Sequence, residues 1–132
     1  VLLSIKGIGP RTVEAMLAYI DDVNRFSDSK RLCSYFGLTP KLDESGKMRR
    51  LGHITKQGPA VARWLLCEAS WGVIRHSPAL RDHYERVMCG QKDRKKKAII
   101  AVSRKLVSII YGMLKTNKLF NEELVNNMLT AA

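Results

Sequence analysis

The segment around Ser45 carries the side chains best suited to chemistry on a phosphate. It reads Glu44-Ser-Gly-Lys-Met-Arg-Arg50 and continues to Ile54-Thr-Lys-Gln-Gly58. A serine hydroxyl is a weak nucleophile unless a base or a metal activates it, and cations around a phosphate stabilise the charge that develops on its oxygens. A turn with a solvated basic loop would have the same composition. The chemical interpretation predicts Ser45 as the nucleophile, with Gly46, Lys47, Arg49, Arg50 and Lys56 as phosphate contacts.

A second phosphate-binding pattern lies near the start of the chain, in Leu3-Ser-Ile-Lys-Gly-Ile-Gly-Pro-Arg-Thr-Val13. Glycine lets the backbone approach a phosphate closely, and the unpaired N–H groups at the start of a helix favour an anion. The segment resembles a helix-hairpin-helix, a module that holds the DNA backbone without reading its sequence. The alternative is a glycine turn between two packed helices. The predicted DNA contacts here are Lys6, Gly7, Gly9 and Arg11.

The basic run from Lys92 to Lys97 is the third candidate site. Runs of like charge are usually solvated, yet lysines at the start of a helix oppose its dipole, and a bound phosphate would offset that repulsion. We predict phosphate contacts, to DNA or to RNA, at Lys95, Lys96 and Lys97. Cysteines, histidines and carboxylates do not occur at metal-ligand spacing, so we expect no metal site in this chain.

The elements that must position these residues are expected to be mainly α-helical. Pro10 suits the first position of a helix, and Ser27 or Asp28 can cap a short helix that ends near Gly37. Residues 41–57 have turn residues and many charges but no helical apolar face, so they predict an irregular basic loop or a short β-hairpin. We expect one domain with three parts: the helix-hairpin-helix and short helix (1–36), the basic loop (37–58) and a helical bundle (59–132).

Helical periodicity dominates the rest of the chain. Ser77 and Asn121 are placed to cap two further helices, and a long helix follows the basic run. On the helix that follows Gly58, the residues expected to form a buried stripe are Val61, Trp64, Leu65, Ala69 and Trp71. On the last helix, the apolar side is expected to hold Leu124, Val125, Met128 and Leu129.

The charge balance points to a polyanionic partner. There are 23 Lys and Arg residues against 12 Asp and Glu, a formal net charge of +11. Each cation that neutralises a phosphate releases counterions, so nucleic acid is the first candidate. The uncharged apolar runs are far shorter than the ~20 residues of a membrane helix and no signal peptide is evident, so no membrane partner is expected. Three widely spaced cysteines favour neither disulfides nor zinc and indicate a reducing cytoplasm.

Several short motifs occur in an order that is similar to one protein family. After the helix-hairpin-helix come Arg25-Phe26, Gly37-Leu-Thr-Pro40, Ser45-Gly-Lys-Met-Arg-Arg50 and Ile54-Thr-Lys-Gln-Gly58. Together they resemble the C-terminal domain of IS110/IS116/IS902 transposases over about residues 1–70. Residues 71–132 match only as a generic helical tail. One departure is the acidic pair Asp43-Glu44, where the family often has small or aromatic residues.

The resemblance implies a DNA transposase or recombinase built from two parts. An N-terminal RuvC-like domain with acidic Mg²⁺ ligands would be one part, and we expect it to have been removed upstream of this chain. The other part would hold the serine, which falls on Ser45 and would form a phosphoserine ester with DNA during strand exchange. The resemblance also implies a homo-oligomer, a structured guide RNA and a place in the bacterial nucleoid. Without acidic metal ligands, this chain alone is expected to be inactive.

Two other functions would fit the same sequence. A non-catalytic module would bind the nucleic-acid backbone through the hairpin and the basic loop and cleave nothing. An accessory domain of a repair nuclease would prefer branched or nicked DNA, but it leaves the ordered motifs after Gly37 unexplained. Replacement of Ser45 by alanine separates the hypotheses, because only the recombinase would keep DNA binding and lose strand exchange.

Overall fold

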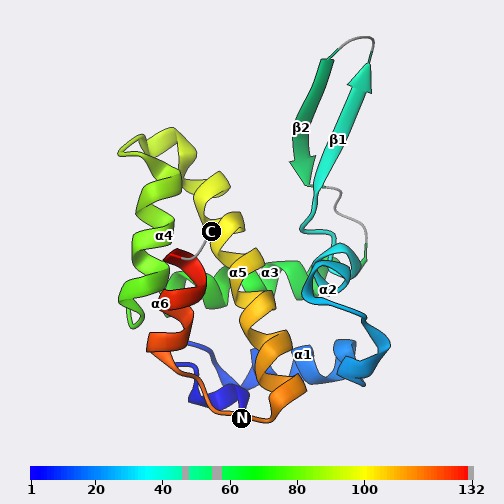
Figure 1. Cartoon of the computed structure of the whole chain (residues 1–132), viewed down its shortest axis with the longest axis vertical. Coiled ribbons are helices and arrows are strands. Elements are labelled where there is room, and N and C mark those ends of the chain that lie inside the picture. Colours follow the sequence, from blue (N-terminus) through cyan, green and yellow to red (C-terminus); the bar gives the residue numbers. More distant parts are fainter. Residues whose placement is uncertain (46–47, 55–57, 131–132) are drawn as a thin grey trace.

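The computed structural model of the chain is an α-helical body from which one β-hairpin projects (Figure 1). It describes the backbone of residues 1–45, 48–54 and 58–130, and the side chains of residues 1–39 and 58–130. The predicted fold class, mainly α, is confirmed. In chain order the elements, with η for a 3-10 turn, are η1 (Leu2–Ser4), α1 (Pro10–Ile20), η2 (Val23–Arg25), α2 (Ser29–Tyr35), β1 (Pro40–Ser45), β2 (Met48–Ile54), α3 (Ala60–Val73), α4 (Pro78–Met88), η3 (Lys92–Arg94), α5 (Lys95–Thr116) and α6 (Glu122–Thr130).

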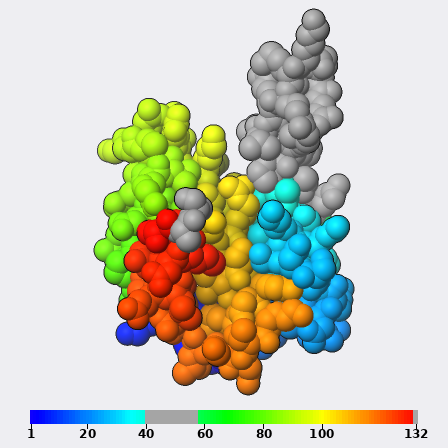
Figure 2. All heavy atoms as spheres, viewed as in Figure 1, coloured from blue at the N-terminus to red at the C-terminus, as the bar shows by residue number. Residues whose placement is uncertain are grey.

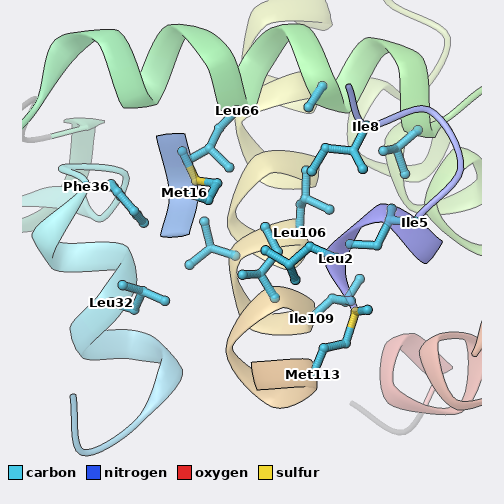
Figure 3. Packing of buried hydrophobic residues seen from close by; sticks show 14 of the residues in the cluster. Leu2, Ile5, Ile8, Met16, Leu32, Phe36, Leu66, Leu106, Ile109 and Met113 are labelled. Carbon is cyan, nitrogen blue, oxygen red and sulfur yellow. The ribbon is translucent and has the colours of Figure 1, made fainter. Parts of the chain in front are cut away.

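Helix α5 runs through the centre of the helical body, and α2, α3 and α4 pack on it (Figure 1). Its apolar residues recur at helical spacing, so one side of α5 faces the core along its whole length. Figure 3 shows Leu106 and Met113 of this helix in one cluster with Leu2 of the N-terminal turn and Leu66 of α3. Burial of each such side chain contributes about 1.5–3 kcal/mol. On α5, five apolar residues at helical spacing are buried: Ile99, Val102, Leu106, Ile110 and Met113.

Helix α5 is also the longest helix described and strongly basic. It is 22 residues long and contains cations but no acidic residue. Figure 2 shows its surface as a strip between the surfaces of α4 and α2. Within the part of the chain that the structure describes, none of the helices combines the length and the apolar character that a membrane span needs.

Three helices begin with the side-chain caps that the sequence predicts. The Asp28 carboxylate accepts from the Arg31 N–H at 2.9 Å at the start of α2, so Asp28 rather than Ser27 is the cap. The Ser77 hydroxyl accepts from the Leu80 N–H at 3.3 Å at the start of α4. Each cap satisfies an amide that has no partner within its helix. Asn121 caps α6 through the N–H groups of Glu123 and Leu124.

Glu122 joins the start of α6 to the start of α4. Its carboxylate accepts hydrogen bonds from the Ser77 hydroxyl at 2.9 and 3.0 Å and from the Ala79 N–H at 2.9 Å. A carboxylate at a helix N-terminus also interacts favourably with the helix dipole. The last helix is therefore held against α4 by a charge-assisted network as well as by its apolar residues Val125 and Leu129.

The buried side of α3 differs from the prediction. Trp64 is 62% exposed, Val61 is 60% exposed and Trp71 is 36% exposed, although all three were expected in the core. Leu65 and Ala69 are buried as predicted, and the other buried residues of the helix lie beside them: Ala62, Leu66, Ser70 and Val73. Small side chains let α3 approach α5 closely, whereas indole rings would hold the two helices apart. Helical spacing alone gave two overlapping apolar stripes and did not decide between them.

The same ambiguity affects other amphipathic helices. In α6, Val125 and Leu129 are buried as predicted, but Leu124 is 61% exposed and Met128 is 39% exposed. Both were expected on the apolar side. A helix with apolar residues at consecutive positions buries only those that face its neighbours, so the partner helix decides which ones are covered.

The N-terminal segment forms less helix than expected. Its apolar residues predict a helix already under way, but the structure has the single 3-10 turn η1. The Ser4 hydroxyl donates to the Val1 carbonyl at 2.6 Å and accepts from the Phe120 N–H at 2.8 Å, which ties this turn to the segment before α6. The first half of the expected helix-hairpin-helix is thus one short turn, and the assignment of that module stays a prediction.

Residues 40–54 contain a two-stranded antiparallel hairpin, the second of the two alternatives predicted for the basic insertion. The register pairs Pro40 with Ile54 and Ser45 with Met48, and a bulge lies between Pro40 and Leu42. An isolated two-stranded hairpin has only marginal stability of its own, so its attachment to the helical body matters.

The chain enters the hairpin from the C-terminal end of α2. Beyond that helix, the Leu38 N–H donates to the Cys33 carbonyl at 3.0 Å, and the hydroxyls of Ser34 and Thr39 lie 3.1 Å apart. Leu38 itself is fully buried. Thr39, directly before β1, is therefore held against α2 by both backbone and side-chain bonds.

The chain leaves the hairpin at the same place. Gly58 has a φ of +85°, and a Cβ atom at this position would overlap the carbonyl oxygen of Tyr35 at the end of α2. Arg63 of α3 donates from Nη1 to the Phe36 carbonyl at 3.2 Å and to the Gly58 carbonyl at 3.3 Å. Both ends of the insertion are therefore attached to one helix end.

We expect Gly58→Ala to lower the free energy of unfolding by about 3 kcal/mol or more, because a left-handed conformation costs ~1–2 kcal/mol and the overlap with Tyr35 adds ~1–3 kcal/mol. Urea denaturation followed by circular dichroism measures this. Gly90→Ala is the matched control, since Gly90 has a φ of +70° with nothing within 4 Å of the added Cβ. Equal losses in the two variants would contradict the overlap argument.

Candidate nucleic-acid interface

The candidate nucleophile Ser45 lies at the tip of the hairpin. It is the last residue of β1 and pairs with Met48, the first residue of β2. Figure 1 shows this tip at the far end of the hairpin, away from the helical body. The predicted contacts Gly46, Lys47 and Lys56 lie outside the described residues. The structure thus places the backbone of Ser45 at the end of β1, and its role as nucleophile stays a prediction.

The hairpin register places acidic and basic positions opposite each other. Asp43 pairs with Arg50 and Glu44 pairs with Arg49. Residues directly opposite in an antiparallel pair share a face of the sheet, and opposite charges at such positions stabilise the pairing. The backbone register therefore matches each of the two acidic positions before Ser45 with an arginine position. Phosphate contacts by Arg49 and Arg50 stay predictions.

Gly7, a predicted phosphate contact, has a structural role within the protein. Its φ is +102°, and an added Cβ would lie 2.6 Å from the backbone carbonyl of Gly72 in α3. A Cβ at Gly72 would in turn lie 2.5 Å from the Gly7 carbonyl oxygen. The two backbones meet where neither has a side chain. Packing against α3 therefore explains why residue 7 is glycine without any ligand.

The start of α1 is open to a partner. Gly9 is the N-cap, makes no side-chain cap, and has nothing within 4 Å of an added Cβ. Lys6 and Arg11 on either side of it are exposed. The first amides of a helix have no partner within the helix, so this end can accept an anion. Phosphate contacts by Lys6, Gly9 and Arg11 stay predictions.

Lys95, Lys96 and Lys97 form the first turn of α5, and all three are exposed. The residue before them, Arg94, provides no side-chain cap. This turn lies at the same end of the helical body as the hairpin, whereas the N-terminal segment lies at the opposite end (Figure 1). The structure thus brings the lysine turn and the hairpin to one side and leaves the turn at residues 6–11 far from both.

Three further cations lie where the sequence analysis did not place a site. Lys30, Arg104 and Lys105 line one groove together with Lys97, between α2, α4 and α5. One signal was available in the sequence: Arg104 and Lys105 follow Lys97 at helical spacing within a segment, 95–116, that has no acidic residue. Helical periodicity could not have linked Lys30 to these residues, because it lies on α2, which comes beside α5 only in the folded chain.

The described residues offer no metal site. They contain no group of three or more histidines, cysteines and carboxylates that could hold an ion. His83 is half-buried in α4, and burial lowers its pKa, with Lys105, Arg86 and Arg104 lowering it further through their charge. The expectation of no metal site in the chain stays a prediction, and the charged groups that act on His83 are all cations.

The cysteines differ widely in their environments. Cys33 is buried, and this burial raises its pKa from 9.0 to about 11 against the opposing charge of Arg104 and Lys105. Burial also raises the pKa of Cys67, while a hydrogen bond from Ser103 lowers it. Cys89 is exposed. Because the thiolate is the reactive form, these environments predict different reactivities.

We expect iodoacetamide at pH 8 to alkylate Cys89 readily, whereas a pKa two units above 9.0 lowers the thiolate fraction of Cys33 about a hundredfold and burial limits access further. Mass spectrometry of the labelled peptides measures each site. In urea the three cysteines should react at similar rates, which provides the control. Equal labelling of Cys33 and Cys89 in the folded chain would contradict the buried position of Cys33.

Comparison with known proteins gives one consistent result. The family model described as "Transposase IS116/IS110/IS902 family" matches residues 1–85. A protein named "Probable family 20 transposase" from Pseudomonas aeruginosa is 30% identical over 115 residues, which cover 86% of this chain and 34% of the relative. A "Pilin gene-inverting protein" from Moraxella lacunata is 32% identical over 126 residues, which cover 93% of this chain and 38% of the relative.

A third relative is also named as a transposase. The "Transposase for insertion sequence element IS1111A" from Coxiella burnetii is 28% identical over 113 residues, which cover 84% of this chain and 31% of the relative. This chain therefore spans about a third of the length of the curated relatives that it matches.

Proposed function

The chain belongs to the IS116/IS110/IS902 transposase family, and from that premise we propose that it is the part of a DNA recombinase that holds DNA and supplies the nucleophile Ser45. Membership of this family implies interaction with DNA. The observation that carries the finer proposal is the place of Ser45, at the tip of a hairpin that projects from a strongly basic helical body.

The chemistry proposed for Ser45 is a transesterification. Its Oγ attacks the phosphorus of a DNA phosphodiester, so that an Oγ–P bond forms and the bond from phosphorus to one sugar oxygen breaks. The hydroxyl proton is lost to a base, and the departing sugar oxygen gains a proton. The phosphoserine ester conserves the phosphodiester bond until a sugar hydroxyl from a partner strand attacks it and releases the serine. Cations beside the reacting phosphate would stabilise the transition state.

Activation of Ser45 requires a group from elsewhere in the protein. The described residues contain no set of ligands for a metal ion, so the Mg²⁺ expected for this chemistry does not fit within them. We propose that an N-terminal RuvC-like part with acidic ligands holds it, and that the isolated chain is inactive. A homo-oligomer and a structured guide RNA belong to the same proposal.

The turn at residues 6–11 fits a second DNA contact. Lys6, Gly9 and Arg11 are exposed around the open start of α1, at the end of the body opposite to the hairpin. A recombinase must hold more than one DNA segment during strand exchange. Two separated backbone contacts on one chain are suited to that task, although Gly7 serves the packing of the turn on α3.

Covalent trapping tests the proposal. The longer protein to which we assign this chain is incubated with Mg²⁺ and a nicked DNA substrate that releases a short fragment and so prevents religation. We expect a protein–DNA adduct on a denaturing gel, with the nucleotide mass on the peptide that contains Ser45. DNA that is cut without an adduct would mean that water or a 3′-hydroxyl attacks directly, and this chain would then be a non-catalytic DNA-binding module.

A further inference from the structure

The groove between α2, α4 and α5 is lined by cations and neutral side chains. Its volume is about 590 Å³. The cations Lys30, Lys97, Arg104 and Lys105 line it, and among the described residues no aspartate or glutamate does. Hydroxyl groups also line it, from α2 and the residue before β1 (Ser29, Ser34 and Thr39) and from α5 (Ser108). Ammonium, guanidinium and hydroxyl groups in this combination match the oxygens of phosphates.

Acidic residues on the neighbouring helices face elsewhere. Neither α2 nor α5 contains an acidic residue. Helix α4 does contain Asp82 and Glu85, but these line a separate hollow towards α6, together with Asn126 and Thr130. The residues that α4 presents to the groove are His83 and Val87. The fold therefore separates its charges by face and keeps the groove positive.

The cations on α5 follow the axis of the groove. Lys97 and Lys105 are eight residues apart on one helix face, a rise of about 12 Å at ~1.5 Å per residue. Successive phosphates of one strand of duplex DNA advance about 3.4 Å along the axis, so this length matches three to four phosphates. Lys30 lies across the groove on α2. The spacing suits a single backbone that runs between the helices.

One buried and one half-buried side chain line the groove close to its cations. Cys33 and His83 both line it, and the charges of Arg104 and Lys105 act on both. Burial raises the pKa of Cys33, and the two positive charges lower it again because they favour the thiolate. Burial lowers the pKa of His83, and the same charges lower it further because they favour the neutral imidazole. Arg104 and Lys105 therefore lie close enough to Cys33 and His83 to act on both from the groove lining.

The groove adjoins the base of the hairpin. Thr39 lines it and is the residue directly before β1, and the hydroxyl pair with Ser34 holds this point on α2. A strand that lies in the groove therefore meets the chain where the hairpin begins. From there the hairpin extends to Ser45 at its tip.

We propose that this groove binds the sugar-phosphate backbone of one strand of the DNA on which Ser45 acts, with Lys30, Lys97, Arg104 and Lys105 as its phosphate contacts. This inference rests on the proposed function, because it takes DNA as the substrate. It assigns DNA binding to the side of the helical body that carries the hairpin. It also adds Lys30, Arg104 and Lys105, which lie outside the sequence motifs of the family.

A pair of charge-matched triple variants of the 132-residue chain tests the groove. One is Lys30→Gln, Arg104→Gln and Lys105→Gln. The control is Arg31→Gln, Arg75→Gln and Lys118→Gln, which removes the same charge from exposed cations that do not line the groove. Fluorescence anisotropy measures the affinity for a 20-bp DNA duplex of mixed sequence between low and physiological salt. Melting curves show that each variant is folded.

We expect the groove variant to bind DNA about a hundredfold more weakly at low salt and to lower the salt slope by about 2–3, since each lost phosphate contact removes ~0.9 from it. The DNA affinity of the control variant should fall by less than about fivefold. Equal losses in the two variants would overturn the groove while leaving DNA binding, and so the proposed function, intact. No binding by the unaltered chain would overturn both.

Two further measurements distinguish DNA from RNA as the ligand and show whether binding occurs in the groove. An RNA duplex of the same sequence is the second probe, and a loss confined to RNA would overturn the assignment to DNA. NMR titration of His83 in the unaltered chain reports on the groove itself. Phosphates bound there would offset the field of Arg104 and Lys105, so we expect the pKa of His83 to rise on addition of the DNA duplex. An unchanged pKa of His83 under saturating DNA would overturn the proposal.

Discussion

Replacement of Ser45 by alanine in the longer protein is expected to reduce strand exchange by about 10⁴-fold or more while DNA affinity changes less than about twofold. The reason is that the proposed reaction forms a covalent bond to the Ser45 hydroxyl oxygen, and alanine has no atom that can form this bond. At the tip of the hairpin, Ser45 is also remote from the core, so its loss should not unfold the helices. Exchange is measured on supercoiled DNA that carries both recombination sites, and affinity by anisotropy.

Ser27→Ala provides the matched control for that prediction. Ser27 is an exposed serine in the turn before α2 and does not line the basic groove. Its replacement should leave exchange unchanged. If Ser45→Ala and Ser27→Ala were equally active, the nucleophile would lie elsewhere. If Ser45→Ala lost DNA binding in proportion to exchange, the serine would be a binding residue and not a nucleophile.

Gly72→Ala should lower the free energy of unfolding by about 3 kcal/mol or more, because its added Cβ meets the backbone of a distant segment. An added Cβ would lie 2.5 Å from the Gly7 carbonyl oxygen and 3.3 Å from the Gly7 carbonyl carbon. Both are backbone atoms and cannot rotate away. Alanine normally stabilises a helix by ~0.8–1 kcal/mol relative to glycine, so a loss would show that the overlap exceeds this gain.

Gly112→Ala separates the overlap from helix propensity. Gly112 lies within α5, and an added Cβ there has nothing within 4 Å. We expect this variant to melt at a slightly higher temperature and Gly72→Ala to melt about 10 °C lower or more. Differential scanning calorimetry measures both. A melting temperature of Gly72→Ala at or above that of the unaltered chain would contradict the close approach of Gly7 to α3.

The sequence predicted the features that depend on neighbours in the chain. The caps Asp28, Ser77 and Asn121 follow from residue type and from the apolar positions after them. The buried face of α5 follows from a long periodic pattern that has only one continuous apolar side. These features are local, so the chemistry of a few consecutive residues determines them.

Features that depend on contacts between distant segments were not predictable in the same way. The exposure of Trp64 follows from how α3 meets α5, and the apolar spacing of α3 allowed either stripe to be buried. Gly7 suggested a ligand, yet its partner is Gly72, which is 65 residues away in the chain. Lys30 joins Arg104 in one groove only because α2 packs on α5. Charge and glycine content indicate binding, but the fold decides which residues face the partner.

The attachment of both hairpin ends to the end of α2 gives the hairpin the mechanics of a lever. Thr39 and Gly58 form the pivot of this lever. Ser45 lies at the other end of an arm of about 20 Å, which is the length of a seven-residue strand at ~3.3 Å per residue. A rotation of ~10° at the pivot displaces the tip by about 3–4 Å, and ~1 Å is enough to reduce a reaction rate about a hundredfold. If Ser45 is the nucleophile that we propose, small angular changes beside α2 would therefore decide whether its hydroxyl reaches a phosphate.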